Sequence, residues 1–180
     1  MIRPLAAAFL LLTVPVVMPA QAQTPPLAGP QAYAPFVPLI GKSWRGTSIK
    51  GDGAEDIQRW EWAIGGHAVR VIHSVNGGAY AGETLIFRDK EKGYIYHYFT
   101  TAGFHTTGVM TPTGPGTFTS EETVHGLSGF GDIRSTLTLD AAGVWRTRAS
   151  VQKNGAWVEM GGFDYREDPA AVPILPKVGQ

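Results

Sequence analysis

Turn signals at short, regular intervals constrain the fold of this chain more than any other sequence feature. They separate runs of seven to ten residues that are rich in Val, Ile, Thr, Tyr, Phe and Trp, and no sustained helical spacing interrupts them. β-branched and aromatic runs bounded by Gly and Asn-Gly steps are typical of antiparallel hairpins. The turn signals are Gly51-Asp52-Gly53, Gly65-Gly66, Asn76-Gly77-Gly78, Lys92-Gly93, Ala102-Gly103, Gly114-Pro115-Gly116 and Asn154-Gly155.

These signals predict an all-β fold of about ten strands with little helix. The expected strands cover residues 44–50, 55–64, 67–75, 80–88, 94–101, 104–111, 117–124, 133–139, 144–151 and 157–165. Strands at this pitch form either a sandwich or a barrel. The short links favour an antiparallel up-and-down barrel, because closure removes exposed strand edges.

One hairpin can be aligned residue by residue. A two-residue turn at Gly65-Gly66 places Ile64 opposite His67, Trp62 opposite Val69, Trp60 opposite Val71 and Gln58 opposite His73. Side chains alternate along a strand, so these eight share one face. Because this face is mostly apolar and the other carries charges such as Glu61 opposite Arg70, we expect the first face to point inward.

The two ends of the chain lie outside the barrel. Residues 1–22 are typical of a signal peptide, with Arg3, an uncharged apolar run and the small-x-small site Ala20-Gln21-Ala22. Cleavage after Ala22 would place the protein in the periplasm or outside the cell, with no membrane span remaining. Residues 23–40 form a Pro-rich arm with a short turn against the core, residues 41–167 the barrel, and residues 168–180 a Pro-rich tail.

Charge and cysteine content exclude several function classes. The chain has 15 basic and 15 acidic side chains, and losing Arg3 leaves 14 against 15. No basic stripe is visible, which argues against nucleic acid as a partner. The chain has no cysteine, which excludes disulfides, thiolate catalysis and Cys-ligated metals.

The start of the barrel resembles bacterial lipocalin-like (calycin-type) β-barrels of unknown function. The resemblance rests on Gly41-Lys42-Ser43-Trp44-Arg45-Gly46, one residue longer than the lipocalin Gly-x-Trp, and on the tract from Tyr96 to Phe104. The resemblance implies a small barrel with an internal cavity, but it does not point to a particular activity. Nitrobindin-type haem barrels are a more distant likeness, but their haem histidine lies late in the chain, whereas the last histidine here is His125. We therefore expect no cofactor.

Histidines and aromatic residues supply the candidate ligand contacts. His73 falls on the inward face of the aligned hairpin, where the more common role is that of a core histidine bonded to a backbone group or a Thr hydroxyl. If Ala102-Gly103 is a two-residue turn, His97 and His105 point to opposite faces, and a bulge at Gly103 would place them together. With the aromatic residues added, the expected ligand-binding residues are Trp60, Trp62, His73, His97, Tyr98 and His105.

Other residues give weaker signals. Glu121 and Glu122 are sequence neighbours, so their side chains should point to opposite faces. No helical metal-ligand spacing, nucleophile elbow or phosphate loop is present, so we expect no metal site.

We therefore expect a barrel that binds a small, mostly apolar molecule. Three alternatives remain open. The chain could be an enzyme that uses cavity histidines and a carboxylate such as Glu83 for acid–base chemistry. It could be a haem or metal carrier, or an envelope interaction protein with a filled interior.

Overall fold

The computed structural model describes residues 29–179, which form one closed antiparallel barrel. The expected signal peptide and its cleavage site lie outside the described residues. A 3-10 segment, η1 (Gly29–Phe36), precedes ten strands, and two 3-10 turns, η2 (Ile64–Gly66) and η3 (Asn76–Gly78), connect early hairpins. The strands are β1 (Ser43–Ser48), β2 (Glu55–Ala63), β3 (Ala68–Val75), β4 (Tyr80–Asp89), β5 (Gly93–Thr100), β6 (His105–Gly114), β7 (Thr117–His125), β8 (Ile133–Leu139), β9 (Trp145–Lys153) and β10 (Ala156–Glu167).

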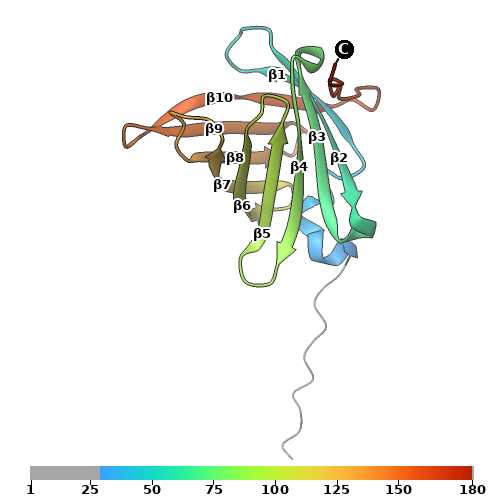
Figure 1. The fold of residues 1–180 in the computed structure, drawn as a ribbon. Helices are drawn as coiled ribbons and strands as arrows, with labels where there is room; N and C mark the ends of the chain where they lie inside the picture. Colours follow the sequence, from blue (N-terminus) through green and yellow to red (C-terminus); the bar gives the residue numbers. More distant parts are fainter. Residues whose placement is uncertain (1–28, 180) are drawn as a thin grey trace, which may run out of the picture.

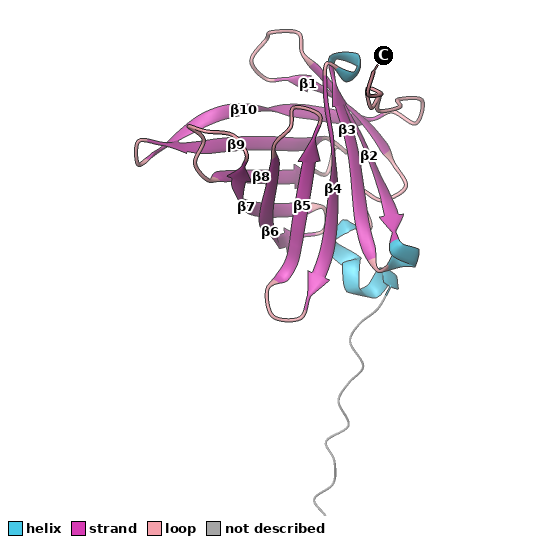
Figure 2. Cartoon of the chain, in the orientation of Figure 1, coloured by secondary structure: helices cyan, strands magenta, loops and turns pink. Residues whose placement is uncertain are grey.

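Each strand pairs with its neighbours in sequence, and the first strand pairs with the last. The closing ladder runs from Trp44 opposite Glu167 to Ser48 opposite Phe163. Figure 1 shows β2 to β5 running at a steep angle to β8 to β10 around a common interior, and Figure 2 shows how little helix accompanies them. The predicted ten-stranded up-and-down barrel is confirmed, and it is compatible with a lipocalin-like fold.

The register expected for the β2–β3 hairpin is also confirmed along its strands. Gln58 lies opposite His73, Trp60 opposite Val71 and Trp62 opposite Val69. The prediction fails only at the tip, where the ladder ends at Ala63 opposite Ala68. Ile64 adopts a positive φ of 49°, which turns its side chain away from the barrel and leaves it 63% exposed.

The register that the sequence left open at Ala102-Gly103 is resolved in the described structure. The Thr100 amide donates to the Phe104 carbonyl, and Phe99 lies opposite His105. Gly103 has a φ of 83°, as the bulge alternative requires. His97 and His105 therefore share a face of the sheet.

The segment after the expected leader covers one end of the barrel. Tyr33, Phe36 and Leu39 are buried there, and the Phe36 ring stacks on Phe118 at 4.5 Å between centroids. The Tyr33 hydroxyl donates to the His67 carbonyl over 2.6 Å, which ties the segment to the β2–β3 turn. Apolar burial and backbone bonding thus close this end without a disulfide.

The C-terminal tail lies on the outer face of β3. The Ile174 amide donates to Ser74 Oγ over 2.9 Å, and Ala171 is buried. This contact accounts for the burial of Ser74, whose side chain points away from the interior. Among residues 29–179, no helix has the length and apolar character needed to cross a bilayer.

Candidate functional site

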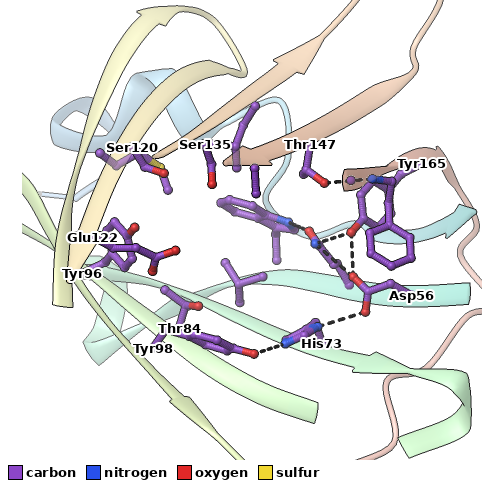
Figure 3. Close-up of a pocket in the computed structure, with 18 of the residues that line it drawn as sticks. Asp56, His73, Thr84, Tyr96, Tyr98, Ser120, Glu122, Ser135, Thr147 and Tyr165 are labelled. Carbon is purple, nitrogen blue, oxygen red and sulfur yellow. Dashed lines mark hydrogen bonds and ion pairs between the residues drawn. The ribbon is translucent and has the colours of Figure 1, made fainter. Parts of the chain in front are cut away.

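The barrel interior forms a cavity of about 380 Å³ beyond the N-terminal segment, and this cavity is open to solvent. Its walls come from inward-facing positions of strands β2 to β10, as Figure 3 shows for most of them. Small-molecule sites generally have volumes of roughly 300–1,000 Å³, so this space suits a small ligand. The lining residues are Asp56, Gln58, Trp60, Val71, His73, Thr84, Ile86, Tyr96, Tyr98, Met110, Ser120, Glu122, Ser135, Leu137, Thr147, Ala149, Met160, Gly161, Gly162, Phe163 and Tyr165.

The cavity has an apolar part and a polar part. Trp60, Ile86 and Met110 are buried side chains that belong to the same core as Phe36 of the N-terminal segment. Polar side chains gather farther along the strands, toward the end of the barrel that the N-terminal segment does not cover. The space therefore offers an apolar surface for a ligand body and hydrogen-bonding groups for a handle.

Gln58 joins the two parts. Its side-chain oxygen accepts hydrogen bonds from Trp60 Nε1 over 3.2 Å and from Trp145 Nε1 over 3.4 Å. Its side-chain nitrogen donates to Tyr165 OH over 2.8 Å and to Asp56 Oδ2 over 3.2 Å. All the hydrogen-bonding capacity of this amide is used within the protein, so Gln58 holds its neighbours in place.

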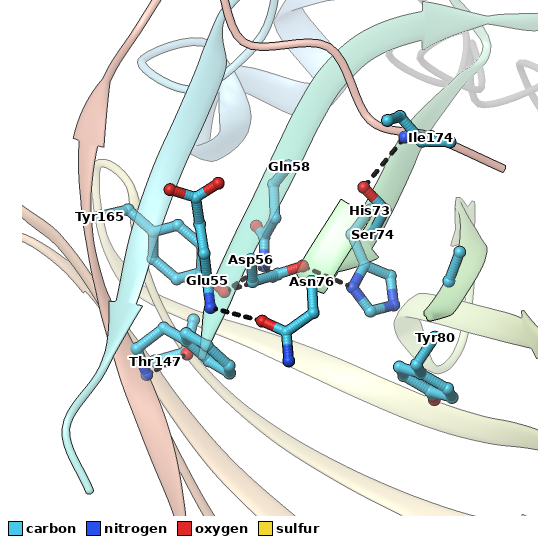
Figure 4. Close-up of polar contacts among 12 residues, drawn as sticks. Glu55, Asp56, Gln58, His73, Ser74, Asn76, Tyr80, Thr147, Tyr165 and Ile174 are labelled. Atoms are coloured by element: carbon cyan, nitrogen blue, oxygen red, sulfur yellow. Dashed lines mark hydrogen bonds and ion pairs between the residues drawn. The ribbon is translucent and has the colours of Figure 1, made fainter. Parts of the chain in front are cut away.

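Asp56 is the most buried charged residue of this network, with an exposed fraction of 2%. Tyr165 OH donates to Asp56 Oδ2 over 2.6 Å, and His73 Nδ1 lies 3.0 Å from Asp56 Oδ1 (Figure 4). With Gln58, three donors converge on one carboxylate, which compensates for its removal from water. Burial, followed by the adjacent Asp56 charge, raises the pKa of Tyr165 well above its usual value, so this phenol keeps its proton.

A chain of hydrogen bonds continues from Asp56 through His73. His73 Nε2 lies 2.6 Å from Tyr98 OH, and Tyr98 OH lies 2.5 Å from Tyr80 OH. When Asp56 accepts from Nδ1–H of the neutral imidazole, Nε2 is an acceptor, so Tyr98 donates to His73 and Tyr80 donates to Tyr98. Both ring nitrogens of His73 are therefore engaged within the protein.

Glycines on neighbouring strands position two of the cavity tyrosines. A Cβ added to Gly82 would lie 2.3 Å from Cε2 of Tyr98, and one added to Gly108 would lie 2.6 Å from Cζ of Tyr96. Each tyrosine ring thus lies directly over a glycine of the adjacent strand, which is a known way for aromatic residues to cover glycines in a sheet. The tyrosine orientations are set by the backbone of β4 and β6.

Glu122 enters the cavity from β7, on the wall away from Asp56 and His73 (Figure 3). The hydroxyl of buried Thr106 donates to Glu122 Oε2. Burial raises the pKa of Glu122, and weaker contributions from Thr106 and Tyr96 oppose this shift. Glu121 is exposed and bonds to Arg134 on the outer surface, so the expected opposite orientations of this pair are confirmed.

The ionisable groups that line the cavity are acidic, phenolic or imidazole. They include Asp56, Glu122 and His73, and no Lys or Arg belongs to the lining within the described chain. The basic side chains of the nearby strands, such as Arg134 and Arg148, point outward and pair with Glu121 and Asp164. Among the described residues, the lining therefore contains no cationic side chain, and one basic side chain, that of Lys50, lies beside the lining residue Gly161.

The structure brings only part of the expected ligand-binding set together. Trp60, His73 and Tyr98 line the cavity. Trp62 lies at the covered end, with its ring 6.0 Å from Tyr33 and 37% of its surface exposed.

The two remaining histidines of that set do not reach the cavity. Tyr96 and Tyr98 point inward from β5, so alternation sends His97 to the outer face, and the resolved register sends His105 there as well. His105 stacks on His125 at 4.8 Å between centroids, and Phe99 lies beside it. These side chains form an outer cluster that is separate from the cavity.

The polar lining residues that the sequence did not single out as ligand contacts include Asp56, Gln58, Glu122 and Tyr165, although Gln58 was placed on the inward face. Asp56 and Gln58 share the inward parity of Trp60, so extending the hairpin argument by two residues would have found Asp56. The place of Tyr165 in the cavity wall follows from the pairing of the last strand with the first, and no local sequence signal reveals that pairing.

The described residues contain no group of three or more His, Asp or Glu side chains arranged to hold a metal ion. His73 is the only histidine that lines the cavity, and Asp56 and Tyr98 occupy both of its nitrogens. His73 therefore has no free imidazole nitrogen to direct at a haem iron or a metal ion.

Comparison of the chain with protein-family models and with curated proteins gives no match. The functional argument therefore rests on the cavity itself.

Proposed function

We propose that the protein is an exported barrel that binds a small, mostly apolar molecule in its interior. The observation that carries the proposal is the cavity of about 380 Å³, apolar on the side of the N-terminal segment and hydrogen-bonding on the other. An apolar ligand body would contact Trp60, Ile86 and Met110, while one polar group would meet the polar wall.

The hydrogen-bonded wall supports binding because it is already organised. Gln58 and Asp56 are held by protein partners before any ligand arrives. A ligand would then lose little affinity to the ordering of side chains, which is one of the main costs of association.

Acid–base catalysis in the same cavity is a second candidate function. The Asp56–His73–Tyr98 chain favours it, because a carboxylate that orients a histidine is a common arrangement in acid–base catalysis. Two features weaken this candidate. His73 has no free ring nitrogen to offer a substrate, and burial raises the pKa of Tyr98 far above the range of a base at neutral pH.

Filling the cavity tests the proposal. Ser135 lines the cavity, and Thr136 beside it is exposed on the outer face. We expect Ser135→Trp to abolish the fluorescence increase of an apolar probe such as N-phenylnaphthylamine, because the indole would occupy the binding space. Thr136→Trp is the matched control and should retain probe binding. Equal probe binding by both variants would refute an interior site.

A further inference from the structure

Glu122 gives the cavity a chemical preference that goes beyond an apolar interior. We propose that the ligand is a lipophilic amine whose ammonium group pairs with the Glu122 carboxylate. This inference rests on the proposed function, since it names the ligand class of the same cavity.

The charges of the lining favour a cation over an anion. Asp56 and Glu122 are the carboxylates of the lining, and no Lys or Arg faces them there within the described chain. His73 cannot serve an anionic ligand, because its two nitrogens are engaged by Asp56 and Tyr98. A carboxylate ligand would therefore bring another negative charge close to Asp56 and Glu122 without a cationic partner in the lining.

The two carboxylates differ in what they can offer. Three donors from Tyr165, Gln58 and His73 already converge on Asp56. Among the described residues, Thr106 donates to Glu122, and Tyr96 is a second hydrogen-bonding side chain beside it. A carboxylate has about four acceptor sites, so Glu122 retains capacity for an ammonium donor, and Figure 3 shows it directed into the cavity.

The ligand body would lie against apolar surface next to this charge. Met110 of β6 and Leu137 of β8 line the cavity on strands that flank the Glu122 strand. Ser120 and Ser135 lie on the same wall and can accept further hydrogen bonds from an ammonium group. An alkyl or aryl chain with one amine at its end fits this distribution of polar and apolar groups.

The test compares three probes that differ only in the head group: decylamine, decanol and decanoate, each below its micelle concentration. Calorimetry or displacement of a fluorescent apolar probe gives the affinity of the intact protein for each. We expect decylamine to bind about tenfold or more tightly than decanol, and decanoate to bind most weakly, because a charge-assisted hydrogen bond exceeds a neutral one by about the free energy of a tenfold change.

Variants of the neighbouring glutamates assign the preference to one side chain. Glu122→Gln keeps the shape of the side chain and should reduce the ratio of amine to alcohol affinity about tenfold. Glu121→Gln, on the outer face beside Arg134, should leave the ratio as in the wild type.

The outcomes separate the two proposals. If decanoate binds as tightly as decylamine, or if Glu122→Gln retains the amine preference, the amine inference is overturned while a cavity that binds apolar molecules stands. If none of the three binds and the fluorescent probe is also excluded, the proposed binding function fails and the inference fails with it. The comparison on the wild-type protein decides the question even if Glu122→Gln does not fold.

Discussion

Tyr165→Phe removes one hydroxyl from the centre of the polar wall and leaves the ring that fills the surrounding space. The Tyr165 side chain is 1% exposed, and its hydroxyl donates to Asp56 over 2.6 Å while accepting from Gln58 over 2.8 Å. Phenylalanine keeps the ring contact with Gly46 across the β1–β10 ladder. The variant therefore isolates the contribution of the hydrogen bonds.

The magnitude follows from the partners. A hydrogen bond to a charged group contributes about 1.5–3 kcal/mol, and a neutral one about 1 kcal/mol. Gln58 keeps its second acceptor, Asp56, at 3.2 Å, so most of its bonding survives. We expect Tyr165→Phe to lower the free energy of unfolding by about 3 kcal/mol, or Tm by roughly 6–12 °C for a domain of this size.

Urea denaturation followed by tryptophan fluorescence measures this change, with Tyr80→Phe as the comparison. The Tyr80 hydroxyl bonds only to the neutral Tyr98 hydroxyl among the described side-chain contacts, so its loss should cost about 1 kcal/mol. A loss in Tyr165→Phe no larger than that in Tyr80→Phe would refute the reasoning that Asp56 anchors the wall as a buried carboxylate.

Three further predictions follow from the same structure. Gly82→Ala places a Cβ 2.3 Å from the ring of Tyr98 and should lower the free energy of unfolding by about 1–3 kcal/mol in thermal denaturation. Burial raises the pKa of Glu122 above its usual 4.5, so the folded state binds this proton more tightly than the unfolded state does. The free energy of unfolding should therefore fall as the pH rises from 4.5 through the raised pKa. Unfolding curves should lose this pH dependence in Glu122→Gln and keep it in Glu121→Gln. Phe36→Ala removes a fully buried ring from the covered end and should cost about 3–5 kcal/mol; Val37→Ala, half exposed beside it, should cost far less.

The architecture was accessible from sequence because it depends on local signals. Glycine-containing turns between β-branched runs give the number of strands, and side-chain alternation gives the inward face of the β2–β3 hairpin. Gln58, Trp60 and His73 are on the expected face because their ladder has no bulge between them. The prediction of Ile64 on that face was wrong because the positive φ at this residue ends the ladder one pair earlier.

The site was less accessible because it is assembled across distant strands. Tyr165 and Asp56 are 109 residues apart, and only barrel closure brings them together. The orientation of His97 and His105 depended on a single residue of register at Gly103, where both alternatives have acceptable turn chemistry. The side chains of Glu121 and Glu122 were expected to point to opposite faces of the sheet. Which of the two points inward could be decided only from the pairing of β7 with β6 and β8.

Native mass spectrometry of the protein isolated from the organism that makes it tests the central claim most directly. An interior binding site predicts a bound small molecule that survives gentle ionisation with the wild-type protein and Thr136→Trp, and that is missing from Ser135→Trp. A wild-type mass that equals the bare polypeptide, or an adduct that Ser135→Trp retains, would contradict the claim that the barrel interior is the binding site.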